Sequence, residues 1–150
     1  PDQIVISGES AAVNEACEKL KAAGAKRAMP LTVSGAFHSP LMQPAADAMA
    51  SILAGVTFHA PRCPVISNVT ARPETDPVLL KELLVKQLVS PVRWVDSMAA
   101  LANMGELTCV ETGPGSVLKG LARKCNAALN VVAADTASNI SSLLESRRAA

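Results

Sequence analysis

Aromatic residues are scarce in this sequence, which contains no tyrosine, one tryptophan and two phenylalanines. Proteins that hold single-stranded nucleic acid stack the bases on aromatic side chains, so this scarcity argues against such a function. The formal net charge is only +1, which provides no overall attraction to nucleic acid or to an anionic membrane surface. We therefore expect neither a nucleic acid nor a membrane as a partner.

Long apolar runs are missing as well. No stretch approaches the ~20 apolar residues that a membrane-spanning helix needs. The opening residues, PDQIVISGES, lack the basic start and long apolar run of a secretory signal peptide. They also lack an initiator methionine, so we expect a mature form or a fragment of a longer chain.

The cysteines form no recognisable metal or redox pattern. The four of them are far apart and no two make a C-x-x-C pair: Cys17, Cys63, Cys109 and Cys125. Two histidines beside them do not complete a zinc-binding spacing. We interpret them as small buried or half-buried thiols in a reducing compartment, and we expect no metal and no cofactor. A redox or metal protein would require the cysteines to meet in space.

What the sequence does contain is typical of a globular protein. It has 150 residues, 49% of them hydrophobic and 18% charged, enough for one domain with its own core. Strand-like and helix-like segments alternate, which predicts an α/β fold with a mostly parallel sheet. We expect strands at 3–7, 27–34, 64–71, 107–113 and 130–135, and helices at 10–24, 44–54, 77–89, 95–105 and 136–148. The segment 113–125 is expected to be a glycine turn that opens a further helix.

One loop carries a histidine in an unusual setting. The segment VSGAFHSPLM, residues 33–42, contains one of the two histidines of the sequence, His38. Pro40 and Pro44 each lack an N–H group and bias the residue before them toward extended geometry. We therefore expect a tight turn at 39–43 and a helix that starts at Pro44, so that His38 lies on a stiff connector. From the residues alone, it is either a structural histidine or a base that awaits a partner.

A second region of interest follows the strand expected at 107–113. The glycine turn GPGSVLKG, residues 113–120, opens a helix, which is the setting for anion binding at a helix N-terminus. It matches neither G-x-G-x-x-G nor a P-loop, and a plain tight turn is the simpler interpretation. Glu111 is either a site carboxylate, a solvated strand end or a member of an ion pair. Basic residues cluster on the exposed side of the same helix: Lys119, Arg123 and Lys124.

Several segments resemble one family in order and spacing. They are PDQIVISG, AAGAKRAMPLTVSGAFHSPLMQPAADAM, PVISNVTA, VKQLVSPVRW and ETGPGSVLKGL. Together they resemble the malonyl-CoA:acyl-carrier-protein transacylases, and the resemblance covers nearly all 150 residues. It implies an α/β-hydrolase-like acyltransferase domain that carries a small ferredoxin-like subdomain. On this map residues 1–33 are the second β-α-β half of the small subdomain, and residues 34–150 are the C-terminal part of the large domain.

The resemblance also implies a part that this chain lacks. The family's nucleophilic serine lies in a G-H-S-x-G elbow, and this sequence contains no G-x-S-x-G segment. The serine, the oxyanion hole and the arginine for the malonyl carboxylate would all lie in a missing N-terminal half. We therefore expect this C-terminal half to be inactive alone.

The implied reaction is transfer of a malonyl group from malonyl-CoA to the phosphopantetheine thiol of acyl carrier protein in fatty acid synthesis, through a serine ester. By match, His38 is the base and the backbone carbonyl of Gln87 orients it. The A-F-H segment resembles that of malonyl-specific acyltransferases, so we expect Phe37 to favour malonyl over methylmalonyl substrates; the alternative is that it only fills core. Lys119, Arg123 and Lys124 form either a merely solvated face or, as we expect for such an enzyme, a docking face for an acidic carrier protein.

The bacterial cytoplasm fits this reaction, as does a plastid or a mitochondrion. The alternative is a non-catalytic α/β binding or structural module in which His38 only packs.

Overall fold

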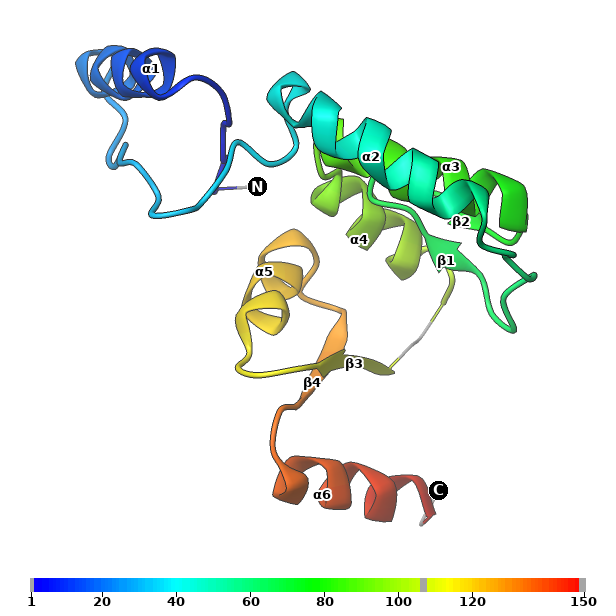
Figure 1. The fold of residues 1–150 in the computed structure, drawn as a ribbon. Coiled ribbons are helices and arrows are strands. Elements are labelled where there is room, and N and C mark those ends of the chain that lie inside the picture. Colours follow the sequence, from blue (N-terminus) through cyan, green and yellow to red (C-terminus); the bar gives the residue numbers. More distant parts are fainter. Residues whose placement is uncertain (1, 106–107, 149–150) are drawn as a thin grey trace. The chain divides into compact units, whose positions relative to one another are not determined.

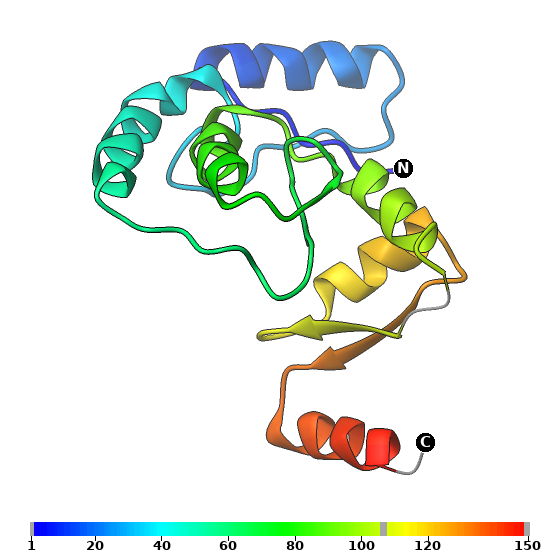
Figure 2. The same ribbon diagram turned by 90° about the vertical axis from the view of Figure 1, so that its right-hand side faces the viewer.

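The computed structural model describes residues 2–105 and 108–148. Its contacts divide the chain into two compact units, Ile4–Arg93 and a second one formed by Pro1–Gln3 with Trp94–Ala150. Figures 1 and 2 show the ribbon in two views, and each unit is described by itself below.

The unit Ile4–Arg93 is built mainly from helices. Two of them, α2 and α3, lie side by side, and the short helices η1 and η2 pack against each other near α2 (Figure 1). A small antiparallel hairpin precedes α3. In chain order the elements are α1 (Ser10–Ala22), η1 (Pro40–Met42), α2 (Gln43–Ala54), β1 (Val65–Ile66), β2 (Pro73–Glu74), α3 (Pro77–Lys86) and η2 (Gln87–Val89).

The second unit is a β-α-β crossover with flanking helices. Its elements are α4 (Trp94–Ala102), β3 (Thr108–Thr112), α5 (Val117–Cys125), β4 (Asn130–Ala134) and α6 (Ala137–Arg148). Strands β3 and β4 are parallel, in a register that runs from Thr108↔Asn130 to Thr112↔Ala134. In both views α5 and α6 lie on opposite sides of this strand pair (Figures 1 and 2).

The core of the second unit forms between α4, α5 and the strand pair. Its buried members are Met98, Ala122 and Leu129, and Trp94 packs against them. Trp94 therefore anchors the start of α4 to this core. The apolar residues of α4 and α5 recur at helical spacing, so each helix presents one face to this core.

The expected α/β architecture and most of the helices are confirmed. The helix expected at 44–54 begins one residue earlier, at Gln43, with Pro44 in its first turn. The helix expected at 77–89 ends as an α-helix at Lys86 and continues as the 3₁₀ turn η2. Asp76 caps its start, because its Oδ1 accepts the Val78 N–H at 2.8 Å. The division at residues 33 and 34 into two subdomains stays a prediction.

The strands expected at 3–7 and 27–34 are wrong for the described chain. No strand is assigned in either segment. Ile4 is 88% exposed and Val33 is 65% exposed, and the Val33 N–H bonds locally to the Leu31 carbonyl at 3.0 Å. Both segments have the β-branched composition of strands, but a strand also needs a hydrogen-bonded neighbour, and no described residue provides one.

The strand expected at 64–71 is also corrected. It shortens to β1, which pairs antiparallel with β2 in the register Val65↔Glu74 and Ile66↔Pro73. Between them, Ala71 adopts a left-handed backbone with φ 55°, and its N–H bonds to the Ser67 carbonyl at 2.8 Å. The chain therefore turns back at 67–71. The expected mostly parallel sheet is also wrong for the described residues. They contain two separate strand pairs, β1 with β2 antiparallel and β3 with β4 parallel.

Candidate active site

His38 is exposed, and two hydrogen bonds hold it to the η2 turn. Its Nδ1 atom lies 2.9 Å from the backbone oxygen of Gln87. Its backbone N–H donates to the next carbonyl, that of Leu88, at 3.1 Å. Both the ring and the backbone of this residue are thus fixed by consecutive carbonyl groups of one turn.

The backbone of His38 is strained. Its φ is 62°, in the left-handed region that residues other than glycine rarely adopt. Such a conformation costs on the order of 1–3 kcal/mol and persists only where its surroundings enforce it. Here the enforcement comes from the bond to Leu88 and from the loop that follows.

Ser39 locks that loop. The residue is only 5% exposed, and its Oγ donates to the Ala36 carbonyl at 2.7 Å. The same oxygen accepts the Leu41 N–H at 3.3 Å, which caps the start of η1. The residues on both sides of His38 are therefore tied to each other, as expected for a stiff connector.

The bond to Gln87 has a chemical consequence. A carbonyl oxygen can only accept, so the Nδ1 atom of His38 must carry the hydrogen. In the neutral ring, the lone pair is then on the Nε2 atom, which is available to accept a proton. The arrangement corresponds to the orienting group of a catalytic triad, with a backbone carbonyl where a carboxylate often stands.

Phe37 lies beside His38 and is 44% exposed, so the described chain does not bury it as core. A Cβ added at Gly35 would lie 3.5 Å from its ring. This is an ordinary van der Waals distance, so the ring lies against Gly35 without requiring a glycine there.

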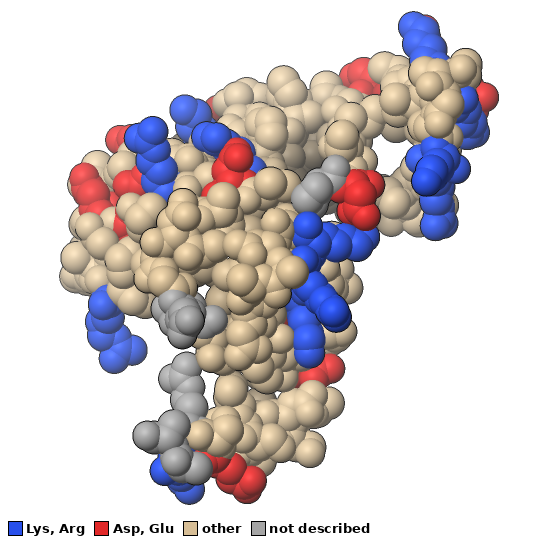
Figure 3. All heavy atoms as spheres, turned by 180° about the vertical axis from the view of Figure 1, so that it is seen from behind, with Lys and Arg blue, Asp and Glu red and all other residues tan. Residues whose placement is uncertain are grey.

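The three predicted docking residues all lie on α5 and all are exposed. Lys and Arg side chains gather over this helix in the space-filling view (Figure 3). Lys124 also forms an ion pair with Asp2, with its Nζ 3.0 Å from the Asp2 Oδ2. This contact lowers the pKa of Asp2, chiefly through the side-chain hydrogen bond from Lys124.

Glu111 caps the helix that follows the glycine turn at 113–116. Its two carboxylate oxygens accept the backbone N–H groups of Leu118 at 2.9 Å and Lys119 at 2.8 Å. The first turn of α5 thus receives a negative charge from within the chain, which satisfies its unpaired donors. Neither a site carboxylate nor an ion pair describes this residue; it is a helix cap. The glycines allow the turn because Gly113 and Gly115 have φ 125° and 85°.

Neither a metal cluster nor a membrane-spanning helix is found in residues 2–105 and 108–148. No group of three or more histidine, cysteine, aspartate or glutamate side chains there could hold a metal ion. In the same part of the chain, no helix has both the length and the apolar character that a membrane crossing requires. All four cysteines are free, with Cys17 buried and Cys63 exposed.

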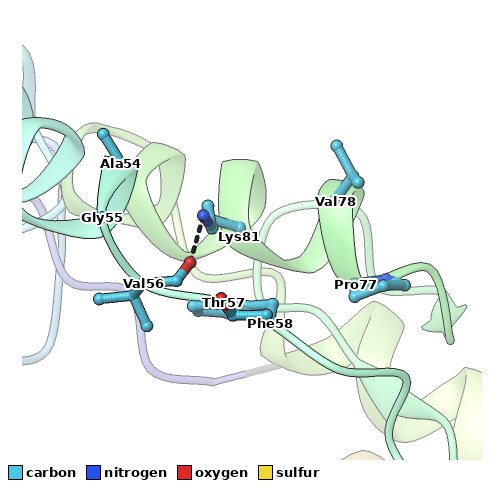
Figure 4. Close-up of a pocket in the computed structure, with 8 residues that line it drawn as sticks. All are labelled: Ala54, Gly55, Val56, Thr57, Phe58, Pro77, Val78 and Lys81. Atoms are coloured by element: carbon cyan, nitrogen blue, oxygen red, sulfur yellow. Dashed lines mark hydrogen bonds between the residues drawn. The ribbon is translucent and has the colours of Figure 1, made fainter.

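A separate cavity of about 350 Å³ lies at the end of α2, beside the start of α3 (Figure 4). Within it, Lys81 donates from its Nζ to the Val56 carbonyl at 2.6 Å and lies 5.4 Å from the centre of the Phe58 ring. These contacts tie the segment after α2 to α3. His38 does not line this cavity, which therefore stands apart from the candidate site.

One residue of the His38 surroundings was not foreseen from the sequence. The Nδ2 atom of Asn68 donates to the side-chain Oε1 of Gln87 at 3.2 Å. The asparagine lies in the PVISNVTA segment, within the turn that replaces the expected strand. In the sequence Asn68 is a polar residue in a largely apolar segment. Such a residue fits the exposed side of a strand, so the strand predicted at 64–71 gave no reason to single it out.

The acyl transferase domain family matches residues 1–141 of the sequence. The chain belongs to this acyl transferase family. It is 48% identical over 124 residues to the malonyl CoA-acyl carrier protein transacylase of Salmonella typhimurium, covering 83% of this chain and 40% of that protein. The chain spans less than half the length of the curated relatives it matches.

Solved structures of acyl transferases are similar in fold as well. The acyl-carrier-protein S-malonyltransferase of Bartonella henselae matches with a TM-score of 0.86 and 43% identity, over 92% of this chain and 44% of that one. A malonyl-transacylase in complex with its type II PKS acyl-carrier protein matches with a TM-score of 0.85 and 42% identity, over 92% of this chain and 45% of that one. These matches show that the chain has the α/β acyltransferase fold of these proteins over the part of them that it covers.

Proposed function

We propose that this chain is the base-bearing part of a malonyl-CoA:acyl-carrier-protein transacylase. The observation that carries the proposal is the oriented imidazole of His38, whose Nδ1 atom faces the Gln87 carbonyl at 2.9 Å in a member of the acyl transferase family. The nucleophilic serine and the groups that bind the malonyl carboxylate and the oxyanion belong to a segment outside this chain.

In the proposed reaction the serine attacks the thioester of malonyl-CoA while the Nε2 atom of His38 takes the hydroxyl proton. The tetrahedral intermediate collapses to a malonyl-serine ester, and coenzyme A leaves as a thiol after His38 returns the proton to its sulfur. The thiol of the carrier protein's phosphopantetheine arm then attacks this ester, with His38 again as the base. An imidazole can both accept and return a proton, which suits a group that acts in both half-reactions.

The remaining roles belong to the same proposal. Phe37 borders the position of the substrate's α-carbon and disfavours a methyl group there. Lys119, Arg123 and Lys124 attract an acidic carrier protein. Residues 1–33 form the second half of the small subdomain and residues 34–150 the rest. We place the reaction in fatty acid synthesis, in the bacterial cytoplasm or in a plastid or mitochondrion.

The test is complementation. The purified chain is assayed for malonyl transfer from malonyl-CoA to acyl carrier protein, alone and together with a segment that carries a G-H-S-x-G elbow from a relative. We expect transfer only in the second case. Robust turnover by the chain alone, abolished by altering a serine within it, would contradict the proposal. A folded complex of both parts that transfers nothing would favour a binding or structural module.

A further inference from the structure

The position of the Gln87 carbonyl depends on what fixes η2. This turn follows α3 directly and ends at Val89, and the Ser90 N–H bonds to the Gln87 carbonyl at 3.4 Å, a long contact. The side chain of Gln87 makes a further bond outside its own helix, because its Oε1 accepts from Asn68 Nδ2 at 3.2 Å. One residue thus supplies two acceptors, its backbone oxygen to His38 and its amide oxygen to Asn68.

The turn that presents Asn68 is itself anchored. Ser67 is only 8% exposed, and its backbone N–H donates to the Arg72 carbonyl at 3.2 Å. The carbonyl of Asn68 accepts the Arg93 N–H at 3.0 Å, and the guanidinium of Arg93 donates to the Thr70 carbonyl at 3.3 Å. The chain just after η2 is therefore bound to the turn that also holds Gln87. Asn68 is connected to the η2 region on two sides.

We propose that Asn68 is a positioning residue for the candidate base. Its bond to the Gln87 amide fixes η2 so that the Gln87 and Leu88 carbonyls meet the ring and the backbone of His38. Asn68 acts through Gln87 and touches no reacting atom. The inference rests on the proposed function of His38, and it gives the side chain at position 87 a role beyond its backbone carbonyl.

The need for such support follows from the exposure and strain of His38. The imidazole of His38 is exposed and belongs to a left-handed residue, so its hydrogen bond to the Gln87 carbonyl is a contact that can fix its orientation. A displacement of about 1 Å in a reacting group is enough to lower a rate substantially. Loosening the carbonyl that holds Nδ1 would therefore reduce catalysis without removing the base.

The kinetic test uses the assembled transacylase that contains this chain. We expect Asn68→Ala to lower kcat for malonyl transfer about ten-fold, by analogy with the loss of roughly 10–100-fold when a group that orients a metal-bound histidine is removed. The KM for malonyl-CoA should change little. Gln87→Met keeps the carbonyl but loses the amide, and it should have a similar effect. Both substitutions break the same bond, the one between the side chains of Asn68 and Gln87. The double variant should therefore be no slower than the slower single variant.

The matched control is Gln43→Ala, which removes a glutamine amide bonded at 2.7 Å to Asp47 on the exposed side of α2. It should leave kcat unchanged. If Asn68→Ala and Gln87→Met both keep the kcat of the parent enzyme, or if their effects simply add in the double variant, Asn68 does not position His38.

A second readout does not depend on turnover. The ¹⁵N NMR shifts of the His38 ring, assigned by their loss in His38→Ala, report which nitrogen carries the hydrogen at about pH 9, well above the ordinary histidine pKa of about 6.5. In the parent protein the hydrogen should be on Nδ1, and Asn68→Ala should produce a mixture of both tautomers. An unchanged tautomer in that variant contradicts the positioning role. If the tautomer shifts but the parent protein transfers no malonyl group, the positioning role of Asn68 is supported and only the proposed function is disproved.

Discussion

The Nδ1 atom of His38 and the backbone oxygen of Gln87 are 2.9 Å apart, although 49 positions separate the two residues in the sequence. The contact joins a loop before α2 to the turn after α3. It leaves the Nε2 atom as the one ring nitrogen able to take up a proton in the neutral state. The candidate base therefore has a defined tautomer before any substrate arrives.

Replacing His38 should remove proton transfer while the serine and its oxyanion hole remain. Loss of a general base typically lowers kcat by about 10²–10⁴-fold. We expect this for both His38→Ala and His38→Asn in the assembled transacylase, measured with malonyl-CoA and acyl carrier protein. Asparagine tolerates the left-handed backbone at this position better than alanine, so it separates the chemical loss from strain. Near-normal kcat in the asparagine variant would show that His38 is not the base.

Phe37→Ser should relax the preference for malonyl-CoA. In the proposed site, the ring beside the candidate base would crowd a methyl group on the α-carbon of the substrate, and one methyl group is typically worth about 1–3 kcal/mol of discrimination. The ratio of kcat/KM for methylmalonyl-CoA to that for malonyl-CoA should rise roughly ten-fold or more. Phe37→Leu keeps most of the bulk and serves as the control. A ratio that does not move in the folded serine variant would place the selectivity elsewhere.

Reversing two charges on α5, with Lys119→Glu and Arg123→Glu, should raise the KM for acyl carrier protein. Both residues are exposed, and attraction between oppositely charged surfaces acts mainly on association. The increase should shrink as salt is added, and kinetics with coenzyme A thioesters should stay the same. Lys26→Glu with Arg27→Glu reverses the same charge at another exposed segment. If the control variant and the α5 variant raise KM equally, the effect comes from net charge and not from docking.

Glu111→Ala should destabilise the protein because two backbone N–H groups of α5 lose their acceptor. Hydrogen bonds to a charged group contribute about 1.5–3 kcal/mol, and we expect a loss of about 1–3 kcal/mol in the free energy of unfolding by urea. Glu111→Gln keeps one oxygen and should lose less. Glu145→Ala, on the exposed surface of α6, should change stability by less than about 0.5 kcal/mol. Equal stability of the Glu111 and Glu145 variants would refute the capping role.

The carboxyl group of Asp2 should titrate below its ordinary pKa of 3.8, because the hydrogen bond and charge of Lys124 favour its ionised form. A lowered pKa in the folded state means that the contribution to stability is present above pH 3.8 and is lost as the pH falls through the folded value. Carbon NMR of the carboxyl group measures this pKa directly. In Lys124→Gln the pKa of Asp2 should rise toward 3.8. If the pKa is the same with and without Lys124, the ion pair does not persist in solution.

Helices were predictable from this sequence because their signals are local. Pro44 in the first turn, the capping Asp76 and the apolar spacing of the helices are all encoded within a few residues of the element they define. The histidine loop was predictable for the same reason, since Pro40 lies in η1 directly after Ser39.

Strands depend on partners that a local pattern does not contain. The run Ile4–Ile6 looks like a strand, but no described residue pairs with it. The turn at Ala71 was hidden for a different reason. Alanine rarely adopts φ 55°, so nothing in the sequence marks a reversal there as a glycine would. The link between Asn68 and Gln87 follows from that reversal and could not be predicted without it.

The parallel pairing of β3 with β4 has a consequence for the order in which the protein folds. Thr108 and Asn130 are paired across only 22 positions of chain, whereas the bond between His38 and Gln87 spans 49. The entropy lost in closing a loop increases with its length, and topologies with short closures fold faster. The crossover of β3, α5 and β4 can therefore form early. We expect the surroundings of His38 to close later, so a refolding chain should regain the crossover of β3, α5 and β4 before its candidate base is in place.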